Sequence, residues 1–218
     1  MSLGNERVSV CSPLFLVLYL FFVFVKFLRI TDPSIPNYAI TLLLGLSLWA
    51  FFTEAVTLGM TSIVARGDLM RKINFPKYIV ILSSMVSALI SLSINLLVVL
   101  AFAIFAGVKF QWSVLLLPFN IILLFATAFG LALILSTLYV KFRDISHIWE
   151  VFMQALFYAV PVIYPITMVA SASPFAAKVF LLNPIAQVIQ DVRYFLITDQ
   201  TITTWNYLPE RLYYLIPL

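Results

Sequence analysis

Long runs of apolar residues constrain the fold of this chain more than any other feature of its sequence. Five stretches each reach the ~17–25 residues that a helix needs to cross the hydrocarbon core of a bilayer. They lie at about 13–30, 39–64, 78–107, 113–140 and 147–168. A segment in lipid must satisfy its own backbone hydrogen bonds, so all five are predicted to be α-helical. Hydrophobic residues make up 63% of the chain, charged residues only 10%, and the mean hydropathy is +1.09. The sequence therefore predicts an all-α membrane protein with about five transmembrane helices in one domain, residues 1–218.

Two shorter apolar elements follow the fifth stretch. Ser173 and Asn183 each stand directly before a proline, a pattern typical of an N-cap followed by the first helical turn. The helices that these pairs begin, at about 174–182 and 184–198, are too short to cross a membrane. We expect them to form a re-entrant or interfacial hairpin that packs on the rest of the protein.

Positive charge is divided unevenly between the loops that join the apolar stretches. One side holds Arg7, Arg66, Arg71, Lys72, Lys77, Lys141 and Arg143. The other side holds Lys26, Arg29 and Lys109. Lysine and arginine are enriched in cytoplasmic loops, so this distribution places the N-terminus inside the cell. The net charge of +4 is therefore attributed to loops that set the orientation of the chain in the membrane, and no nucleic-acid partner is predicted.

Residues that could carry catalysis or bind a nucleotide are scarce. The six glycines form neither a phosphate-binding loop nor a dinucleotide fingerprint. Cys11 and His147 are the only residues of their types, which leaves too few groups for a metal site or a nucleophilic centre. We therefore predict no catalytic residue, no metal and no bound cofactor, and expect any energy for function to come from another protein.

The loop after the second apolar stretch carries a short amphipathic pattern. Apolar residues repeat there at helical spacing beside two basic residues, and a proline ends the turn: Leu69, Met70, Arg71, Lys72, Ile73, Phe75 and Pro76. One interpretation is an interfacial helix held at the membrane surface by its basic residues. The other is a docking element for a cytosolic partner, with Phe75 as its aromatic anchor.

A second short loop places Arg143 and Asp144 at the membrane boundary after the fourth stretch. Adjacent helical positions point about 100° apart, so each side chain is expected to have its own partner. Asp144 suits the N-terminus of the next helix. Arg143 is expected to contact a carboxylate or backbone carbonyls in a partly buried site, which would brace the fourth and fifth spans together.

Glu54 is a carboxylate within the second apolar stretch. A charged side chain at that depth costs on the order of 2.5–3.5 kcal/mol by insertion scales. Its presence indicates either a wet cavity on a path through the membrane or a structural pairing near the cytosolic end, and the sequence leaves both open.

Four segments in order along the chain resemble a known family. They are Arg71-Lys72-Ile73-Asn74-Phe75-Pro76, then Phe142-Arg143-Asp144-Ile145, then Pro161 to Pro165, then Asn183-Pro184 with Arg193. Together they resemble the permease subunit of type-two ABC exporters, which move lipid-linked O-antigen, capsular polysaccharide or teichoic acid out of bacteria. The resemblance covers roughly residues 13–210.

The resemblance implies a homodimer in the bacterial plasma (inner) membrane, bound to a separate ABC ATPase that holds ATP and magnesium. It implies contact with that ATPase through Arg71, Lys72, Ile73, Phe75, Pro76, Arg143 and Asp144. The helices that line the path in similar exporters would here carry Trp49, Phe52, Glu54, Trp149, Phe152 and Tyr158, whose rings suit the apolar faces of sugars in a lipid-linked glycan. An exit gate is implied at Pro161, Tyr164, Pro165, Asn183 and Pro184.

Two departures from the family and two alternative functions also follow. Members of the family usually open with an amphipathic helix, for which residues 1–12 are short and polar, and end with a sixth span, which we expect to be missing or truncated here. A drug or small-lipid exporter of the same fold is one alternative function. A membrane enzyme acting on polyprenyl-linked sugars is the other, but it would need clustered carboxylates or histidines.

Overall fold

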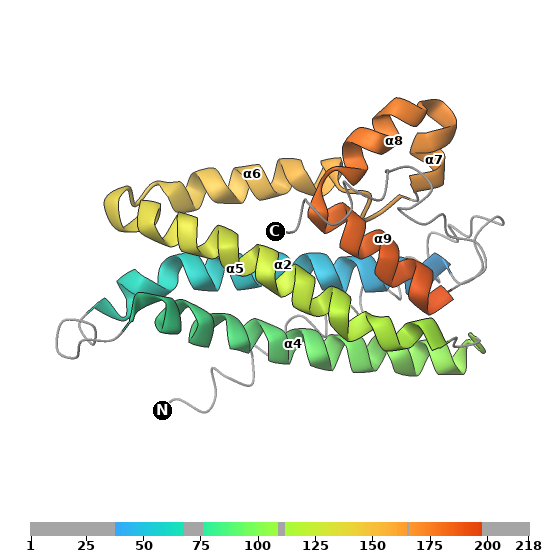
Figure 1. Ribbon diagram of the computed structural model, residues 1–218, viewed down its shortest axis with the longest axis horizontal. Coiled ribbons are helices and arrows are strands. Elements are labelled where there is room, and N and C mark those ends of the chain that lie inside the picture. The colour runs from blue at the N-terminus through green and yellow to red at the C-terminus, as the bar shows by residue number, and fades with distance from the viewer. Residues whose placement is uncertain (1–37, 68–75, 109–111, 165, 198–218) are drawn as a thin grey trace.

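The computed structural model describes residues 38–67, 76–108, 112–164 and 166–197 (Figure 1). These residues contain helices and turns and no strand, which confirms the all-α prediction. In chain order the helices are α2 (Tyr38–Ala65), α4 (Lys77–Phe105), the short 3-10 helix η2 (Trp112–Leu116), α5 (Leu117–Lys141), α6 (Ile145–Ala159), α7 (Ile166–Ala172), α8 (Pro174–Leu181) and α9 (Pro184–Ile197).

Three helical segments of the described part are long and apolar enough to cross a membrane. They are Ile40–Ala65, Lys77–Phe105 and Val114–Lys141. They confirm the second, third and fourth of the predicted stretches, whereas the first, at 13–30, lies outside the described residues.

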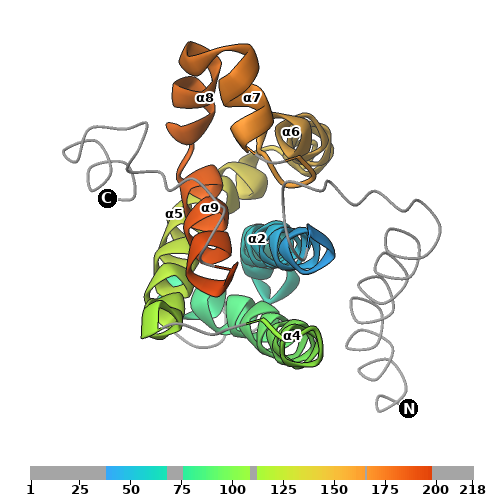
Figure 2. The same cartoon turned by 90° about the vertical axis from the view of Figure 1, so that its right-hand side faces the viewer.

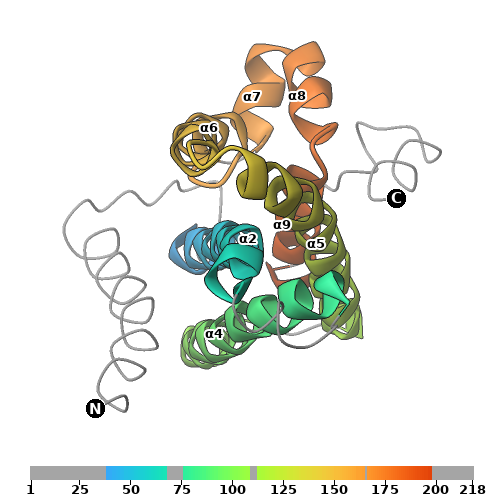
Figure 3. The same cartoon turned by 90° about the vertical axis from the view of Figure 1, so that its left-hand side faces the viewer.

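Helix α2 is the centre of the structure. Seen end-on, it lies between α4 and α6, with α5 and α9 along its flank (Figures 2 and 3). In the most apolar part of α2, 67% of the residues are buried, against 28% for α4 and 22% for the α5 segment. A helix that is apolar on all sides is expected to be surrounded by protein, and the outer faces of α4 and α5 are left for lipid.

A glycine allows α2 and α5 to approach closely. A Cβ atom built on Gly59 would lie 2.6 Å from the Cβ of Ala132 on α5, and 3.3 Å from both Ile81 and Met85 on α4. Small residues at such contacts let membrane helices pack backbone to backbone, which increases their van der Waals contact.

The prediction of one continuous span over 147–168 is wrong. Helix α6 ends at Ala159, and Val160 is extended, with φ −92° and ψ 133°. The residue before a proline is driven out of the α region, and Pro161 follows directly. At ~1.5 Å per residue, the 15 residues of α6 measure about 22 Å, which is short of the ~30 Å hydrocarbon thickness. We call residues 160–164 the break.

The two predicted short helices are present, and both predicted N-caps are confirmed. The Ser173 hydroxyl accepts from the Ala176 N–H at 3.4 Å, and the Asn183 side-chain oxygen accepts from the Ile185 N–H at 3.0 Å. Their expected pairing is wrong, because α8 forms a hairpin with α7 that projects from the bundle (Figure 1). Helix α9 instead packs against α5 and α2, with its apolar side chains buried in the main core.

The contact at Gly59 leads to a testable prediction. Gly59→Ala should lower the free energy of unfolding by about 1–3 kcal/mol, because the added methyl group overlaps Ala132 in a packed interface. Thermal unfolding of the detergent-solubilised protein would measure it. Gly130→Ala is the matched control, since a Cβ there meets nothing within 4 Å. It should be neutral or stabilising, because alanine favours helix over glycine. Equal effects of the two changes would show that the α2–α5 contact is loose.

Candidate functional site

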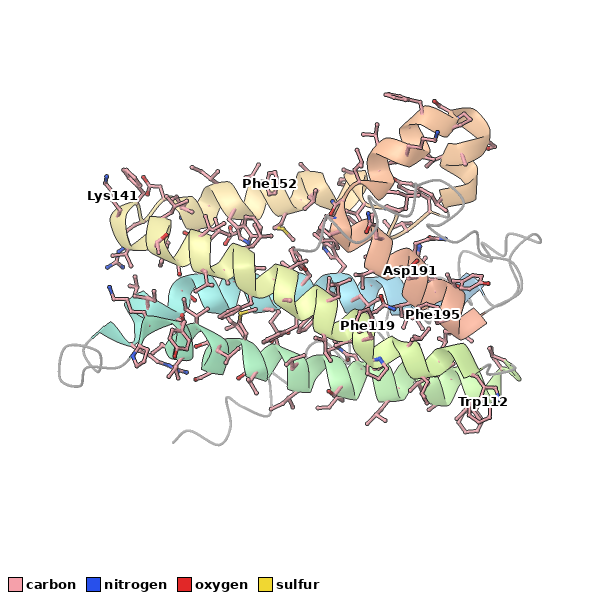
Figure 4. All side chains as sticks on the ribbon, viewed as in Figure 1. Trp112, Phe119, Lys141, Phe152, Asp191 and Phe195 are labelled. Atoms are coloured by element: carbon pink, nitrogen blue, oxygen red, sulfur yellow. The ribbon has the colours of Figure 1, made fainter. Side chains whose placement is uncertain are left out.

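Four of the six described basic residues gather at one end of the bundle. Arg66 lies at the end of α2, Lys77 begins α4, and Lys141 and Arg143 flank the end of α5; all four are exposed. Lys141 and Trp112 mark opposite ends in Figure 4. The hairpin of α7 and α8 lies toward the end opposite the basic one (Figure 1). This arrangement agrees with a cytoplasmic end at Lys141 and an outer end near the hairpin.

Most of the predicted ATPase-coupling residues, Arg71, Lys72, Ile73 and Phe75, lie outside the described residues. Pro76 is exposed and occupies the N-cap position of α4, with φ −63° and ψ 125°.

Arg143 and Asp144 do not form the predicted brace within the described part of the chain. Both are exposed. The Arg143 guanidinium lies 6.0 Å from the ring of Tyr139 on the preceding helix. Asp144 occupies the N-cap position of α6, where its backbone carbonyl accepts from the His147 N–H at 3.1 Å, but its side chain makes no capping bond. The expectation of a partly buried site is therefore wrong, and both residues present their charge at the surface.

A groove of about 450 Å³ runs between α2 and α6. Aromatic and polar side chains line it together: Trp49, Thr53, Thr57, Trp149, Glu150, Met153, Gln154, Phe157 and Tyr158. The rings are in contact. Trp49 and Phe157 have centroids 5.6 Å apart across the two helices, and Phe157 meets Tyr158 edge-on at 5.7 Å. The groove therefore offers flat apolar surfaces beside hydrogen-bonding groups.

The polar groups of this groove differ in how they are satisfied. The Thr53 hydroxyl donates to the Trp49 carbonyl at 3.0 Å, which leaves its lone pairs as acceptors. Trp149 is buried, and its indole Nε1 has no hydrogen-bond partner. A buried donor without a partner costs about 1–3 kcal/mol, so an acceptor that reached it would be stabilised by a similar amount.

Glu54 lines a second hollow of about 420 Å³ on the same helix. Trp49, Thr53 and Thr57 belong to both spaces, so the two adjoin along α2. The Glu54 carboxylate also forms a side-chain hydrogen bond with Ser91 of α4. Glu54 thus has a hydrogen-bonding partner and also borders an open space, and the two interpretations of it from the sequence both stay open.

The structure divides the predicted path residues into three groups. Trp49, Trp149 and Tyr158 line the groove, and Glu54 lines the adjoining hollow. Phe152 is exposed and stacks on Trp149 at 5.6 Å without lining the groove. Phe52 is fully buried in the core, so the structure does not place it on either space.

Sequence reasoning missed two groove residues that a helical period would have found. Thr53 follows Trp49 at an interval of four. Met153 follows Trp149 at the same interval on α6. Residues four apart share a helical face, so each tryptophan marks a stripe of neighbours.

No metal-ion site emerges from the described residues. They contain no group of three or more His, Cys, Asp or Glu side chains able to hold an ion. His147 and Glu150 approach to 3.8 Å near the start of α6, where both are largely exposed. An exposed pair of this kind contributes little to stability.

Two of the predicted gate residues, Pro161 and Tyr164, lie in the break. Pro161 is buried there, and the Tyr164 hydroxyl donates to the Tyr158 carbonyl at 2.9 Å. Asn183 caps α9 and Pro184 begins it, whereas Pro165 lies outside the described residues.

Arg193 is the residue whose importance the sequence concealed most. It is 3% exposed, and its Nε and Nη1 atoms donate to the carbonyls of Thr41 at 3.2 Å and Pro161 at 2.7 Å. Its Nη2 donates to the carbonyl of Val162. In the sequence, Arg193 stood out only as a basic residue and as part of the four segments that resemble the family. Its hydrogen-bond partners are more than thirty residues away, and no local pattern indicates them.

Fold and groove together define a helical, membrane-spanning protein with an aromatic surface along its central helix. Comparison with known proteins then identifies it: the chain belongs to the ABC-2 type transporter family, whose sequence profile matches residues 3–197. The family predicted from the four ordered segments is therefore confirmed.

Relatives in this family are similar over most of the chain. The O-antigen export system permease protein RfbA of Myxococcus xanthus is 29% identical over 156 residues, covering 72% of this chain and 60% of that protein. Two proteins of the same name from Klebsiella pneumoniae are each 25% identical over 185 residues, covering 83% of this chain and 68% of theirs. The chain thus spans about 60% of the length of the Myxococcus relative.

The cap at Asn183 can be tested by substitution. Asn183→Ala should lower the free energy of unfolding by about 1 kcal/mol, because the Ile185 N–H loses its acceptor at the start of α9. Asn183→Ser should retain most of that stability, since serine is an equally good N-cap. Thermal unfolding of both variants in detergent would measure the difference. If serine and alanine were indistinguishable, the cap would be irrelevant to stability.

Proposed function

We propose that this chain is the permease subunit of an ATP-driven ABC exporter that moves a lipid-linked polysaccharide across the bacterial plasma membrane. The substrate class is a glycan of the O-antigen, capsule or teichoic-acid type. Family membership supports the transport role, and the names of the relatives support the substrate. The observation that carries the proposal is the groove of aromatic and polar side chains along α2 and α6.

The chemistry of that groove fits a sugar chain. Sugar rings present apolar C–H faces that stack on aromatic rings, while their hydroxyls need donors and acceptors. Trp49, Phe157 and Tyr158 supply rings, and Thr53 and Gln154 supply polar groups between them. Stacking of this kind is weak for each ring, which suits a polymer that must slide rather than remain bound.

A second copy of the chain would complete the path, as expected of a homodimer. Glu150 and Gln154 line the groove and are exposed on its open side. In a lone subunit this side would face hydrocarbon, where a carboxylate is costly. A partner subunit facing α6 would replace that lipid with protein and water.

The energy source in this proposal is a separate ABC ATPase at the cytoplasmic end, which binds ATP and magnesium. Arg66, Lys77, Lys141 and Arg143 are exposed at that end, and in the sequence Arg66 and Lys77 flank the loop that holds Arg71 and Lys72. Exposed charges at a rim steer association and fix the register of a partner.

The path can be tested at an exposed ring. Tyr158→Ala should reduce export of the polysaccharide by roughly two- to tenfold in vesicles containing the permease and its ATPase, because one stacking surface is lost. Tyr158 is 73% exposed, so the fold should survive. Phe119→Ala is the matched control, since Phe119 is 62% exposed on α5 and does not line the groove. Equal loss in both variants would contradict a path along α2 and α6.

The ATPase contact can be tested by charge reversal. Replacing both Arg71 and Lys72 with Glu should uncouple ATP hydrolysis from export while the protein remains inserted, because the reversed charges repel the partner's surface. Lys178→Glu is the control, since Lys178 is exposed on α8, away from the basic end. Export and ATP hydrolysis would be measured together in reconstituted vesicles. Unchanged export in the double variant would reduce the loop to a membrane-surface anchor.

A further inference from the structure

Helix α9 holds the hairpin of α7 and α8 by both of its ends. Arg193 donates to the Pro161 and Val162 carbonyls, where the chain leaves α6. Gln187, which is also buried, donates to the Leu181 carbonyl at 2.7 Å, where the chain leaves α8. The hairpin has only a small core of its own, formed by Ile166, Ala177 and Leu181. These two side chains of α9 therefore help to attach the hairpin to the bundle.

The Arg193 contacts satisfy backbone carbonyls that lack a helical donor at the break. A backbone carbonyl in an apolar region requires a donor, and irregular backbone at membrane depth is tolerated only where protein or water supplies one. At the break the helical ladder stops, so the carbonyls of Pro161 and Val162 are not satisfied by a continuing helix. The guanidinium donates to both, and its third contact, to Thr41, fixes them against the first turn of α2.

Only a glycine on α2 leaves room for this arrangement. A Cβ built on Gly45 would overlap the Nη2 atom of Arg193 and lie 3.1 Å from its Cζ and 3.3 Å from the Val162 carbonyl oxygen. A single methyl group at position 45 would therefore push against the guanidinium and the break at once. This offers a way to disturb the contact while Arg193 itself remains in the chain.

We propose that Arg193 is a positioning residue that sets the orientation of the α7–α8 hairpin over the outer end of the export path. With its three carbonyl contacts in place, the break is held against α2 and the hairpin has one orientation. Without the contacts to Pro161 and Val162, the hairpin is free to take other orientations at the end of α6. The inference of an exit rests on the proposed function; the positioning of the hairpin does not.

Arginine is required for this role, and lysine cannot replace it. The guanidinium is a rigid planar fork whose separate N–H groups reach several acceptors at once, whereas an ammonium is a compact charge on a flexible stem. Arg193→Lys therefore keeps the charge but cannot hold Thr41, Pro161 and Val162 together. The Arg193→Lys variant therefore distinguishes a role in positioning the hairpin from a role that needs only a positive charge.

The orientation of the hairpin can be measured without any substrate. Spin labels on cysteines at Phe175 of α8 and Trp112 near η2, both exposed, would be introduced after Cys11→Ser in the full chain. Diluting labelled with unlabelled chains keeps the measured distances within one subunit. Wild-type protein in lipid nanodiscs should give one narrow distance distribution. Arg193→Lys and Gly45→Ala should each raise the population at other distances by about tenfold, and Gln187→Met should do so to a smaller degree.

One control variant and three outcomes test the positioning role of Arg193. Gly130→Ala, where an added Cβ meets nothing within 4 Å, should leave the distribution unchanged. Unaltered distributions in folded Arg193→Lys and Gly45→Ala protein would overturn the proposal. So would recovery of both variants only as unfolded protein, because Arg193 would then be a requirement for folding alone. If the distances shift as expected but wild-type vesicles export no polysaccharide, the positioning role stands and the proposed function fails.

Discussion

The need to satisfy buried backbone carbonyls shapes this structure where α6 ends. Pro161 ends α6 because the residue before a proline is excluded from the helical region. The carbonyls of Pro161 and Val162 then lie outside the helical hydrogen-bond ladder and need other donors. A single buried guanidinium on α9 supplies them and joins three segments far apart in sequence. The close approach of α2 at Gly45 belongs to the same set of contacts.

The central position of α2 explains how the same helix can both pack in the core and border the groove. Toward α4 and α5 it presents Phe52 and Gly59, which are buried and closely packed. Toward α6 it presents Trp49 and Thr53, which border the groove. A few residues at helical spacing therefore decide which side of an apolar helix packs in the core and which side borders the groove.

Features set by local sequence could be predicted, and features set by long-range contacts could not. Apolar length gave three of the spans, and the Ser-Pro and Asn-Pro pairs gave the starts of α8 and α9, because both signals act within one helical turn. The fifth span was misjudged, since apolar composition outweighed Pro161. Phe52 and Trp49 looked equivalent in sequence, and only packing shows that one ring is in the core and the other in the groove. The role of Arg193 depends on carbonyls 31 to 152 residues away, which no local pattern encodes.

Helix α6 connects the features that an exporter must coordinate. It begins beside Arg143 and Asp144 at the basic end, forms one wall of the groove and ends at the break that Arg193 holds. An α-helix transmits displacement along its axis because its hydrogen bonds keep it rigid over about four turns. In the proposed exporter, a shift imposed by an ATPase at Asp144 would reach Val160 with little loss, and the three carbonyl contacts are the next bonds it would meet. Coupling between ATP hydrolysis and exit opening would then need no path beyond one helix and one arginine.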